Sequence, residues 1–308
     1  MSDDGVGFVG LGIMGQGMAS RLLSEGIAGS LERPLVVWNR TPSKCDDLKA
    51  AFPDKVVEVK GTAREVVESC GVTYCMLSTP EASRSIFEAE DGILAGVAAG
   101  KCIVDCATIR VEDMVRMHDA VAKKGGRFLE APVSGSKVPA EKGQLVFLCA
   151  GSKELFDEVE PTALGAMGKA SHFFGEVGFG TKAKLVVNSL MGTMMAAYSE
   201  GLSLSQDVGL DPTKMIEVIS QSAIASPVYA LKGPKMIKGD HAPNFPLKHA
   251  HKDMKLASDL AREIGAEYSV MNAAEKIFRN SMEDEVLNVA DKDFSAIFEG
   301  VKKESPKK

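Results

Sequence analysis

Two polar side chains stand in an otherwise apolar stretch between residues 175 and 201, which reads GEVGFGTKAKLVVNSLMGTMMAAYSEG. Lys184 and Asn188 are one helical turn apart, so in a helix both would leave the same face. A buried ammonium group is costly unless it has partners or a task, and a fixed ammonium can stabilise and protonate an oxygen that gains negative charge. The alternative is that Lys184 lies in the first turn and its long stem reaches water.

The stretch that carries this pair is predicted to be a long buried helix. It opens with three glycines and then runs for more than twenty residues without a proline, with apolar residues over most of its surface. Helical spacing continues downstream, with no further strand pattern. The predicted helices are Pro212 to Ser220, Leu247 to Ile264, Met271 to Met282 and Asp291 to Phe298.

A glycine motif lies near the start of the chain. Residues 6 to 9 form a short apolar strand, followed by GLGIMG and a predicted helix from about Met14 to Glu25. Strand, glycine turn and helix together are typical of a dinucleotide-binding site, where the backbone approaches a pyrophosphate at the positive end of the helix. The candidate cofactor-binding residues of this turn are Gly10, Leu11, Gly12, Ile13, Met14 and Gly15.

The second predicted strand, Leu35 to Trp38, ends in Asn39, Arg40 and Thr41. An acid at this place usually holds the ribose 2′-hydroxyl of NAD, whereas an arginine suits the 2′-phosphate of NADP. One charge-assisted contact contributes about 1.5 to 3 kcal/mol, which is roughly a ten- to hundredfold preference. Lys44, one turn further on, could add to it, and the alternative is that Arg40 is a solvated turn residue.

Strands and helices go on alternating as far as about residue 174, which predicts a doubly wound sheet. Ligands of such sheets bind beyond the carboxyl ends of the strands, so Ser78, Thr79 and Thr108 are expected on the cofactor side. Leu77, the last residue of the strand before Ser78, is a further candidate for cofactor binding. The sequence therefore predicts an α/β fold with an N-terminal Rossmann-type domain over residues 1–176. An all-α domain is predicted over residues 177–308.

Composition narrows the class of protein. The 308 residues carry a formal net charge of -6, which argues against a nucleic-acid partner. The six cysteines include no C-x-x-C pair, and the H-x-H of His249 and His251 has no acidic or histidine cluster beside it, so no metal site is expected. Neither a signal peptide nor a membrane span is expected, which predicts a cytoplasmic protein, with a mature organellar form as the alternative.

Five segments together, GLGIMG, WNRT, APVSGS, GxGTKAKLVVN and FPLKHAHKD, resemble the β-hydroxyacid dehydrogenase family. Within that family they are most similar to the plant glyoxylate/succinic semialdehyde reductases. The resemblance covers essentially the whole chain. Two departures are a longer loop from Gly26 to Pro34 and Ala107 in place of a serine.

The resemblance implies a role for each matching position. Lys184 would be the catalytic lysine, and Asn188 would help to hold the substrate. Arg40 and Thr41 would bind the 2′-phosphate, and Thr108 and Lys252 would lie near the nicotinamide. The substrate-binding residues implied are Ser134, Gly135, Ser136, Phe245 and Asp253.

The expected activity is therefore NADPH-dependent reduction of a small aldehyde that carries a carboxylate, either glyoxylate or succinic semialdehyde. A 3-hydroxyisobutyrate-type dehydrogenase is the near alternative. A non-catalytic dinucleotide-binding scaffold is the distant one. Members of the family bury helices of the second domain against a partner subunit, so a homodimer or homotetramer is expected.

Overall fold

The computed structural model describes residues 5–304, and side chains as far as residue 302. Contacts within the chain form two compact units, the first ending at Lys184 and the second beginning at Leu185. This division falls inside the long helix α10 (Phe179–Asp207). The placing of a domain boundary between residues 176 and 177 stays a prediction.

The first unit is built on a sheet in the order β3-β2-β1-β4-β5-β6-β8-β7, with β9 paired to β8. The first six strands in this order, from β3 through β2, β1, β4 and β5 to β6, run parallel to one another. The direction in which the chain adds strands reverses between β1 and β4, as in a doubly wound sheet. The strands are β1 (Gly5–Val9), β2 (Leu35–Trp38), β3 (Val57–Val59), β4 (Cys70–Cys75), β5 (Cys102–Asp105), β6 (Arg127–Glu130), β7 (Val133–Ser134), β8 (Leu145–Gly151) and β9 (Gly168–Phe173). The predicted α/β fold class is confirmed.

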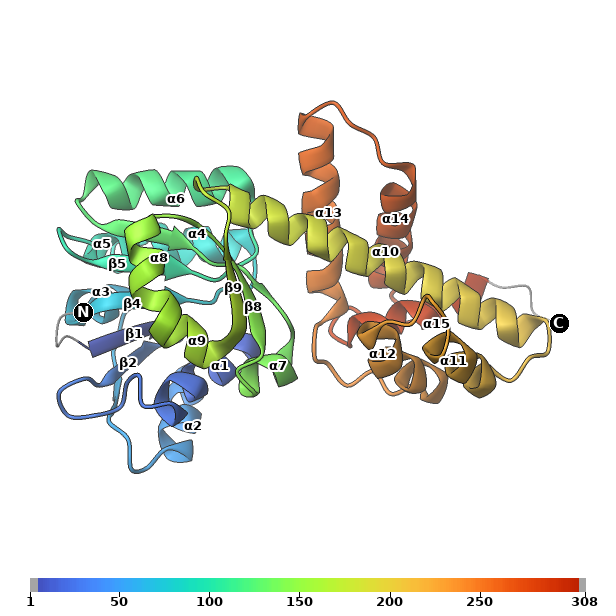
Figure 1. Ribbon diagram of the computed structural model, residues 1–308, viewed down its shortest axis with the longest axis horizontal. Coiled ribbons are helices and arrows are strands. Elements are labelled where there is room, and N and C mark those ends of the chain that lie inside the picture. Colours follow the sequence, from blue (N-terminus) through green and yellow to red (C-terminus); the bar gives the residue numbers. More distant parts are fainter. Residues whose placement is uncertain (1–4, 305–308) are drawn as a thin grey trace. The chain divides into compact units, whose positions relative to one another are not determined.

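Helices cover both faces of the sheet, because successive side chains of each parallel strand point to opposite faces. Phe8 of β1 packs with the helices of one face, and Val9 packs with those of the other. The first face carries α1 (Ile13–Ser24), α2 (Ser43–Ala51), α8 (Lys153–Val159) and α9 (Gly165–Met167), and the second carries α3 (Ala63–Ser69), α4 (Pro80–Glu88), α5 (Ile93–Gly96) and α6 (Val111–Lys123). Figure 1 shows the two sets on opposite sides of the strands.

The strands after β6 change direction. β8 runs antiparallel to both β6 and β7, and β9 pairs with β8 in parallel. The short helix α7 (Lys137–Glu141) lies between β7 and β8, and a π-helical turn at Glu160–Leu164 joins α8 to α9. The chain leaves β9 and enters α10, so the end of this sheet sets where α10 begins.

The second unit is helical throughout its described part. Besides the later turns of α10 it contains α11 (Pro212–Ser220), α12 (Pro227–Lys238), α13 (Leu247–Glu263), α14 (Ser269–Glu283), a 3-10 turn (Phe294–Ala296) and α15 (Ile297–Glu304). Its core joins apolar side chains of all these elements, among them Met195, Leu247, Phe278 and Phe298. No described helix combines the length and apolar character that a membrane span requires.

Two expectations about the helices need correction. Helix α10 is not buried all round: Val186, Leu190 and Leu204 are each more than half exposed, because the sequence gives it apolar residues on more faces than its own chain covers. Helix α12 was not among the predicted helices, and it contains Gly233 and Pro234, two residues that are unfavourable inside a helix. A Cβ at Gly233 would lie 2.2 Å from the Tyr198 hydroxyl, so packing against α10 requires a glycine there.

Two buried carboxyl groups lie side by side at the ends of the neighbouring strands β5 and β6. Asp105 and Glu130 are partners in the parallel register and are both inaccessible to solvent. Burial raises the pKa of Asp105 to about 7, the Ala107 N–H that it accepts opposes this, and the Glu130 charge adds to it. The folded chain therefore takes up a proton here at a pH where the unfolded chain is ionised.

We expect Asp105→Asn to change how stability depends on pH. In the wild type the raised pKa gives stability that is complete below the unfolded pKa and is lost as the pH rises through about 7. Between about pH 5 and pH 8 the unfolding free energy of the wild type should fall relative to the variant by on the order of 2 to 3 kcal/mol. Urea unfolding across this range measures it, with Asp54→Asn at an exposed turn as control. A difference that does not vary with pH contradicts the expectation.

Candidate active site

The predicted cofactor residues of the first unit gather at one edge of its sheet. They follow the carboxyl ends of β1, β2, β4 and β5, which are adjacent and parallel, so the loops that leave them lie side by side. Asn39 links two of these loops, because its Oδ1 accepts the Leu11 N–H at 2.9 Å and its Nδ2 donates to the Thr41 carbonyl at 2.9 Å. The structure thus places Gly10 to Gly15, Asn39 to Thr41, Leu77, Ser78 and Thr108 at this edge.

The three motif glycines are required for different reasons. Gly10 has a φ of +99°, and a Cβ there would lie 2.5 Å from the Met76 carbonyl oxygen. A Cβ at Gly15 would lie 1.9 Å from the Gly10 carbonyl oxygen, so close packing of helix on turn excludes any side chain. A Cβ at Gly12 would meet nothing within 4 Å. The space above Gly12 is therefore open to a ligand.

The residues around this space fit a dinucleotide. Gly12 is the N-cap of α1, and no side chain caps the helix, so its first N–H groups are available to a phosphate. Arg40 and Thr41 are exposed just beyond β2, and Lys44 is exposed in α2 with its Nζ 3.6 Å from Asp47. When bound, a reduced nicotinamide dinucleotide supplies a hydride.

Residues 134 to 136 lie at the end of β7, at the other end of the sheet order from β3. Ser134 and Ser136 are half-buried, and Gly135 between them is exposed with a φ of +144°. Ser136 is the N-cap of α7 but does not cap it with its side chain. The turn therefore presents two hydroxyl groups on either side of a glycine, a combination that suits the anion-binding role predicted for it.

Lys184 lies in the second turn of α10 and is only 5% exposed. Asn188, one turn later, is 3% exposed, so both members of the pair are buried. The burial of Lys184 argues against the alternative in which its long stem carries the ammonium group into water.

Within the second unit, Asp253 holds two other predicted site residues. Its Oδ2 accepts the Asn188 amide at 2.5 Å, and its Oδ1 lies 2.8 Å from the Lys252 ammonium. All three side chains are buried or nearly so, so these contacts are little screened by water. Asp253 therefore fixes the direction of the Asn188 amide and of Lys252.

Phe245 is held by a buried ion pair. Its N–H and that of Asn244 donate to Oδ2 of Asp293 at 3.2 and 3.1 Å, and Asp293 binds Lys232 at 2.7 Å. The Phe245 ring packs edge-on against Phe294 at 5.6 Å. Burial raises the pKa of Asp293, but the Lys232 charge and the hydrogen bonds from Lys232 and Ser295 outweigh it, so the pKa is lowered.

The H-x-H motif shows no sign of a metal ligand set. His251 Nε2 contacts Glu275 at 2.9 Å, and burial followed by the charges of Lys252 and Lys248 lowers the pKa of His249. No group of three histidine, cysteine, aspartate or glutamate side chains in residues 5–302 is arranged to hold a metal ion.

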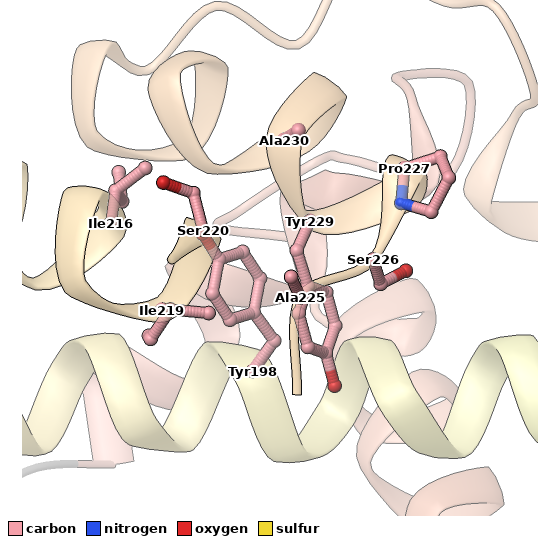
Figure 2. Close-up of a pocket in the computed structure, with 9 residues that line it drawn as sticks. All are labelled: Tyr198, Ile216, Ile219, Ser220, Ala225, Ser226, Pro227, Tyr229 and Ala230. Atoms are coloured by element: carbon pink, nitrogen blue, oxygen red, sulfur yellow. The ribbon is translucent and has the colours of Figure 1, made fainter. Parts of the chain in front are cut away.

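The second unit also holds a cavity of about 240 Å³ that the sequence did not predict (Figure 2). Stacked rings of Tyr198 and Tyr229, 4.1 Å apart, form part of its wall, and Ile216 and Ile219 form another part. None of the described residues that line it is charged.

Two residues that the sequence did not single out hold the start of α10. Glu130 at the end of β6 accepts hydrogen bonds from the first turn, including the Thr181 hydroxyl at 2.7 Å. Two features of the sequence could have pointed to this contact. Glu130 stands directly before APVSGS, and Thr181 directly follows the glycines.

Comparison with known proteins agrees with this arrangement. Residues 5–178 match a family model described as the NAD binding domain of 6-phosphogluconate dehydrogenase. Residues 178–300 match one described as NAD-binding of NADP-dependent 3-hydroxyisobutyrate dehydrogenase. The chain belongs to the β-hydroxyacid dehydrogenase family. It is an NADP-dependent oxidoreductase, as predicted.

Two relatives from Arabidopsis thaliana are similar to the chain over 297 residues, or 96% of its length. Glyoxylate/succinic semialdehyde reductase 2, chloroplastic, is 43% identical with 79% of its own length covered. Glyoxylate/succinic semialdehyde reductase 1 is 42% identical with 98% covered. Among solved structures, Psf3 in complex with NADP+ and 2-OPP is similar with a TM-score of 0.85 at 25% identity, over 96% of this chain and 99% of that one.

We expect Gly12→Ala to weaken NADPH binding without unfolding the protein. The added methyl group meets nothing in the protein but enters the space where a pyrophosphate would approach the backbone. One misplaced methyl group costs about 1 to 3 kcal/mol, so the Kd should rise roughly ten- to hundredfold. Titration of NADPH fluorescence measures it. Gly201→Ala, whose Cβ also meets nothing within 4 Å, is the control, and an unchanged Kd for Gly12→Ala contradicts the assignment.

Proposed function

We propose that the protein reduces small aldehydes that carry a carboxylate, converting glyoxylate to glycolate and succinic semialdehyde to 4-hydroxybutyrate with NADPH. The observation that carries the proposal is the burial of Lys184 and Asn188 on one face of α10, in a chain 42–43% identical to two reductases of that name. Spectrophotometric assay of NADPH consumption with each aldehyde tests it.

The proposed chemical role of Lys184 follows from where charge develops. The carbonyl oxygen of the aldehyde becomes an alkoxide only as the hydride arrives, so a fixed ammonium beside it stabilises the transition state more than the ground state. The same ammonium then donates the proton that completes the alcohol. Asn188, which is held by Asp253, would keep the substrate and the lysine aligned.

The turn at residues 134 to 136 would bind the substrate carboxylate, with Ser134, Gly135 and Ser136 as its donors. Phe245 would form an apolar wall, and Asp253 would orient Asn188 and Lys252 rather than meet an anionic substrate. A like charge beside the carboxylate would cost binding energy, which supports this reading of Asp253. A neutral aldehyde of similar size is accordingly a poor substrate.

A 3-hydroxyisobutyrate-type dehydrogenase is the second candidate. It is favoured by the description of the family model that matches residues 178–300. Oxidation of 3-hydroxyisobutyrate with NADP+ or NAD+, measured beside aldehyde reduction, separates the two.

We also propose a homodimer or homotetramer. Leu190, Leu204, Val208 and Val218 on α10 and α11 and in the turn between them are each more than half exposed, and a second subunit would cover such a face. The proposed compartment is the cytosol. An organelle is the alternative, because the name of one relative includes the word chloroplastic.

We expect Lys184→Ala to lower kcat by roughly 10²- to 10⁴-fold, since it removes both the cation and the proton donor. NADPH binding should survive. Lys182→Ala is the matched control, because it removes a neighbouring amine, which lies 4.4 Å from the centre of the Phe179 ring. Steady-state kinetics with glyoxylate decide, and normal turnover of Lys184→Ala would refute the proposed mechanism.

We expect Arg40→Asp to shift cofactor preference from NADPH toward NADH. The exchange replaces a group that suits the 2′-phosphate with one that repels it, so the ratio of kcat/KM values should change by at least about ten- to hundredfold. Arg64→Asp, at an exposed arginine that binds Glu68, makes the same change in charge elsewhere. An unchanged ratio in Arg40→Asp argues against the assigned role.

A further inference from the structure

Helix α10 begins without a capping side chain of its own. Gly178, with a φ of +95°, precedes its first residue, and the Lys182 N–H donates to the Gly178 carbonyl at 2.9 Å. The N–H groups of the residues before Lys182 have no carbonyl acceptor one turn back within the helix. In most helices a serine, threonine, aspartate or asparagine at this place accepts one of them.

Glu130 supplies the missing acceptors from a different strand. Its Oε1 accepts the N–H groups of Gly178 at 2.5 Å and Gly180 at 2.9 Å. Its Oε2 accepts the N–H of Thr181 at 3.2 Å and the hydroxyl of the same residue at 2.7 Å. One carboxylate at the end of β6 therefore caps a helix that begins about fifty residues later in the chain.

Close packing makes this geometry specific. A Cβ at Gly180 would lie 2.3 Å from the Leu148 carbonyl oxygen and 3.2 Å from Cδ of Glu130, so no side chain fits there. Glu130 is itself inaccessible to solvent. These contacts explain why the helix opens with Gly178, Gly180 and Thr181, a pattern that the proposed chemistry alone does not use.

The strength of this cap depends on whether the Glu130 carboxyl group is ionised. Burial raises the pKa of Glu130, and its four hydrogen bonds oppose the rise. All four of these groups donate to the carboxylate, which favours its ionised form, as does the positive end of the helix. The interaction is thus a charge-assisted one in a dry environment.

We propose that Glu130 is the positioning residue for Lys184 in the reaction proposed above. Thr181 and Lys184 are three residues apart, so fixing the first turn of α10 fixes both the axial position and the rotation of the lysine. The aldehyde need not touch Glu130. Because small displacements of a catalytic group lower the rate steeply, a loosened cap lowers kcat while leaving substrate and NADPH binding nearly intact.

A matched pair of variants at Thr181 tests the inference. Thr181→Val keeps the branched shape and removes the hydroxyl donor, whereas Thr181→Ser keeps the hydroxyl and removes a methyl group. Both alter a fully buried residue, so loss of stability is common to the two. Loss of the hydrogen bond to Glu130 is confined to Thr181→Val.

Two readouts are compared in the two variants. The first is kcat against KM, and we expect kcat to fall about tenfold in Thr181→Val but not in Thr181→Ser, with KM little changed in either. The second is the rate at which an amine-reactive reagent labels Lys184 in the NADPH-bound protein, measured by mass spectrometry. We expect labelling to be several times faster in Thr181→Val than in Thr181→Ser, because the turn that holds the amine is loosened.

Equal labelling of Lys184 in the two variants overturns the inference, as does equal kcat where the wild type is active. The labelling readout does not depend on the proposed function. A wild type that reduces no aldehyde refutes that function, and labelling then decides by itself whether Glu130 positions Lys184.

Discussion

The candidate site depends on one constraint, which is that the first N–H groups of a buried helix must find acceptors. In this chain the acceptor is the Glu130 carboxylate at the end of β6, and the helix is the one that carries Lys184. The sheet thereby fixes the beginning of α10. A replacement that removed the carboxylate would leave several buried donors unsatisfied at once.

The same sheet edge gathers the other predicted residues of the first unit. Parallel strands β2, β1, β4 and β5 end side by side, and each is followed by a loop that holds one part of the cofactor site. Asn39 links two of those loops. In the second unit, two buried carboxylates have the corresponding role. Asp253 accepts a hydrogen bond from Asn188 and pairs with Lys252, and Asp293 with Lys232 holds the backbone of Phe245.

The sequence predicted those features whose cause is local. The first strand, the GLGIMG turn and the helix after it are read from adjacent residues, and the periodicity of α10 and α13 is equally local. Lys184 and Asn188 share a buried helix face for the same reason. The family resemblance, the cofactor class and the α/β fold with a helical second part could therefore be predicted from the sequence.

Features set by distant contacts were missed. The cap joins Glu130 to Thr181, which no local pattern connects, and α12 contains Gly233 and Pro234, which normally end a helix. Helix α10 was predicted to be a long buried helix, but part of its apolar surface is exposed, because apolar character does not reveal which part of a helix its own chain covers. The assigned roles of the site residues stay predictions.

The measurement that bears most directly on the account is a crystal structure of the protein with NADPH and an unreactive analogue of the carboxylate-bearing aldehyde. The account predicts that the Lys184 ammonium lies about 2.7 to 3.1 Å from the oxygen that would become the alkoxide. The analogue's carboxylate should rest on residues 134 to 136. An oxygen bound by some other donor, with the Lys184 ammonium turned to solvent, would contradict it.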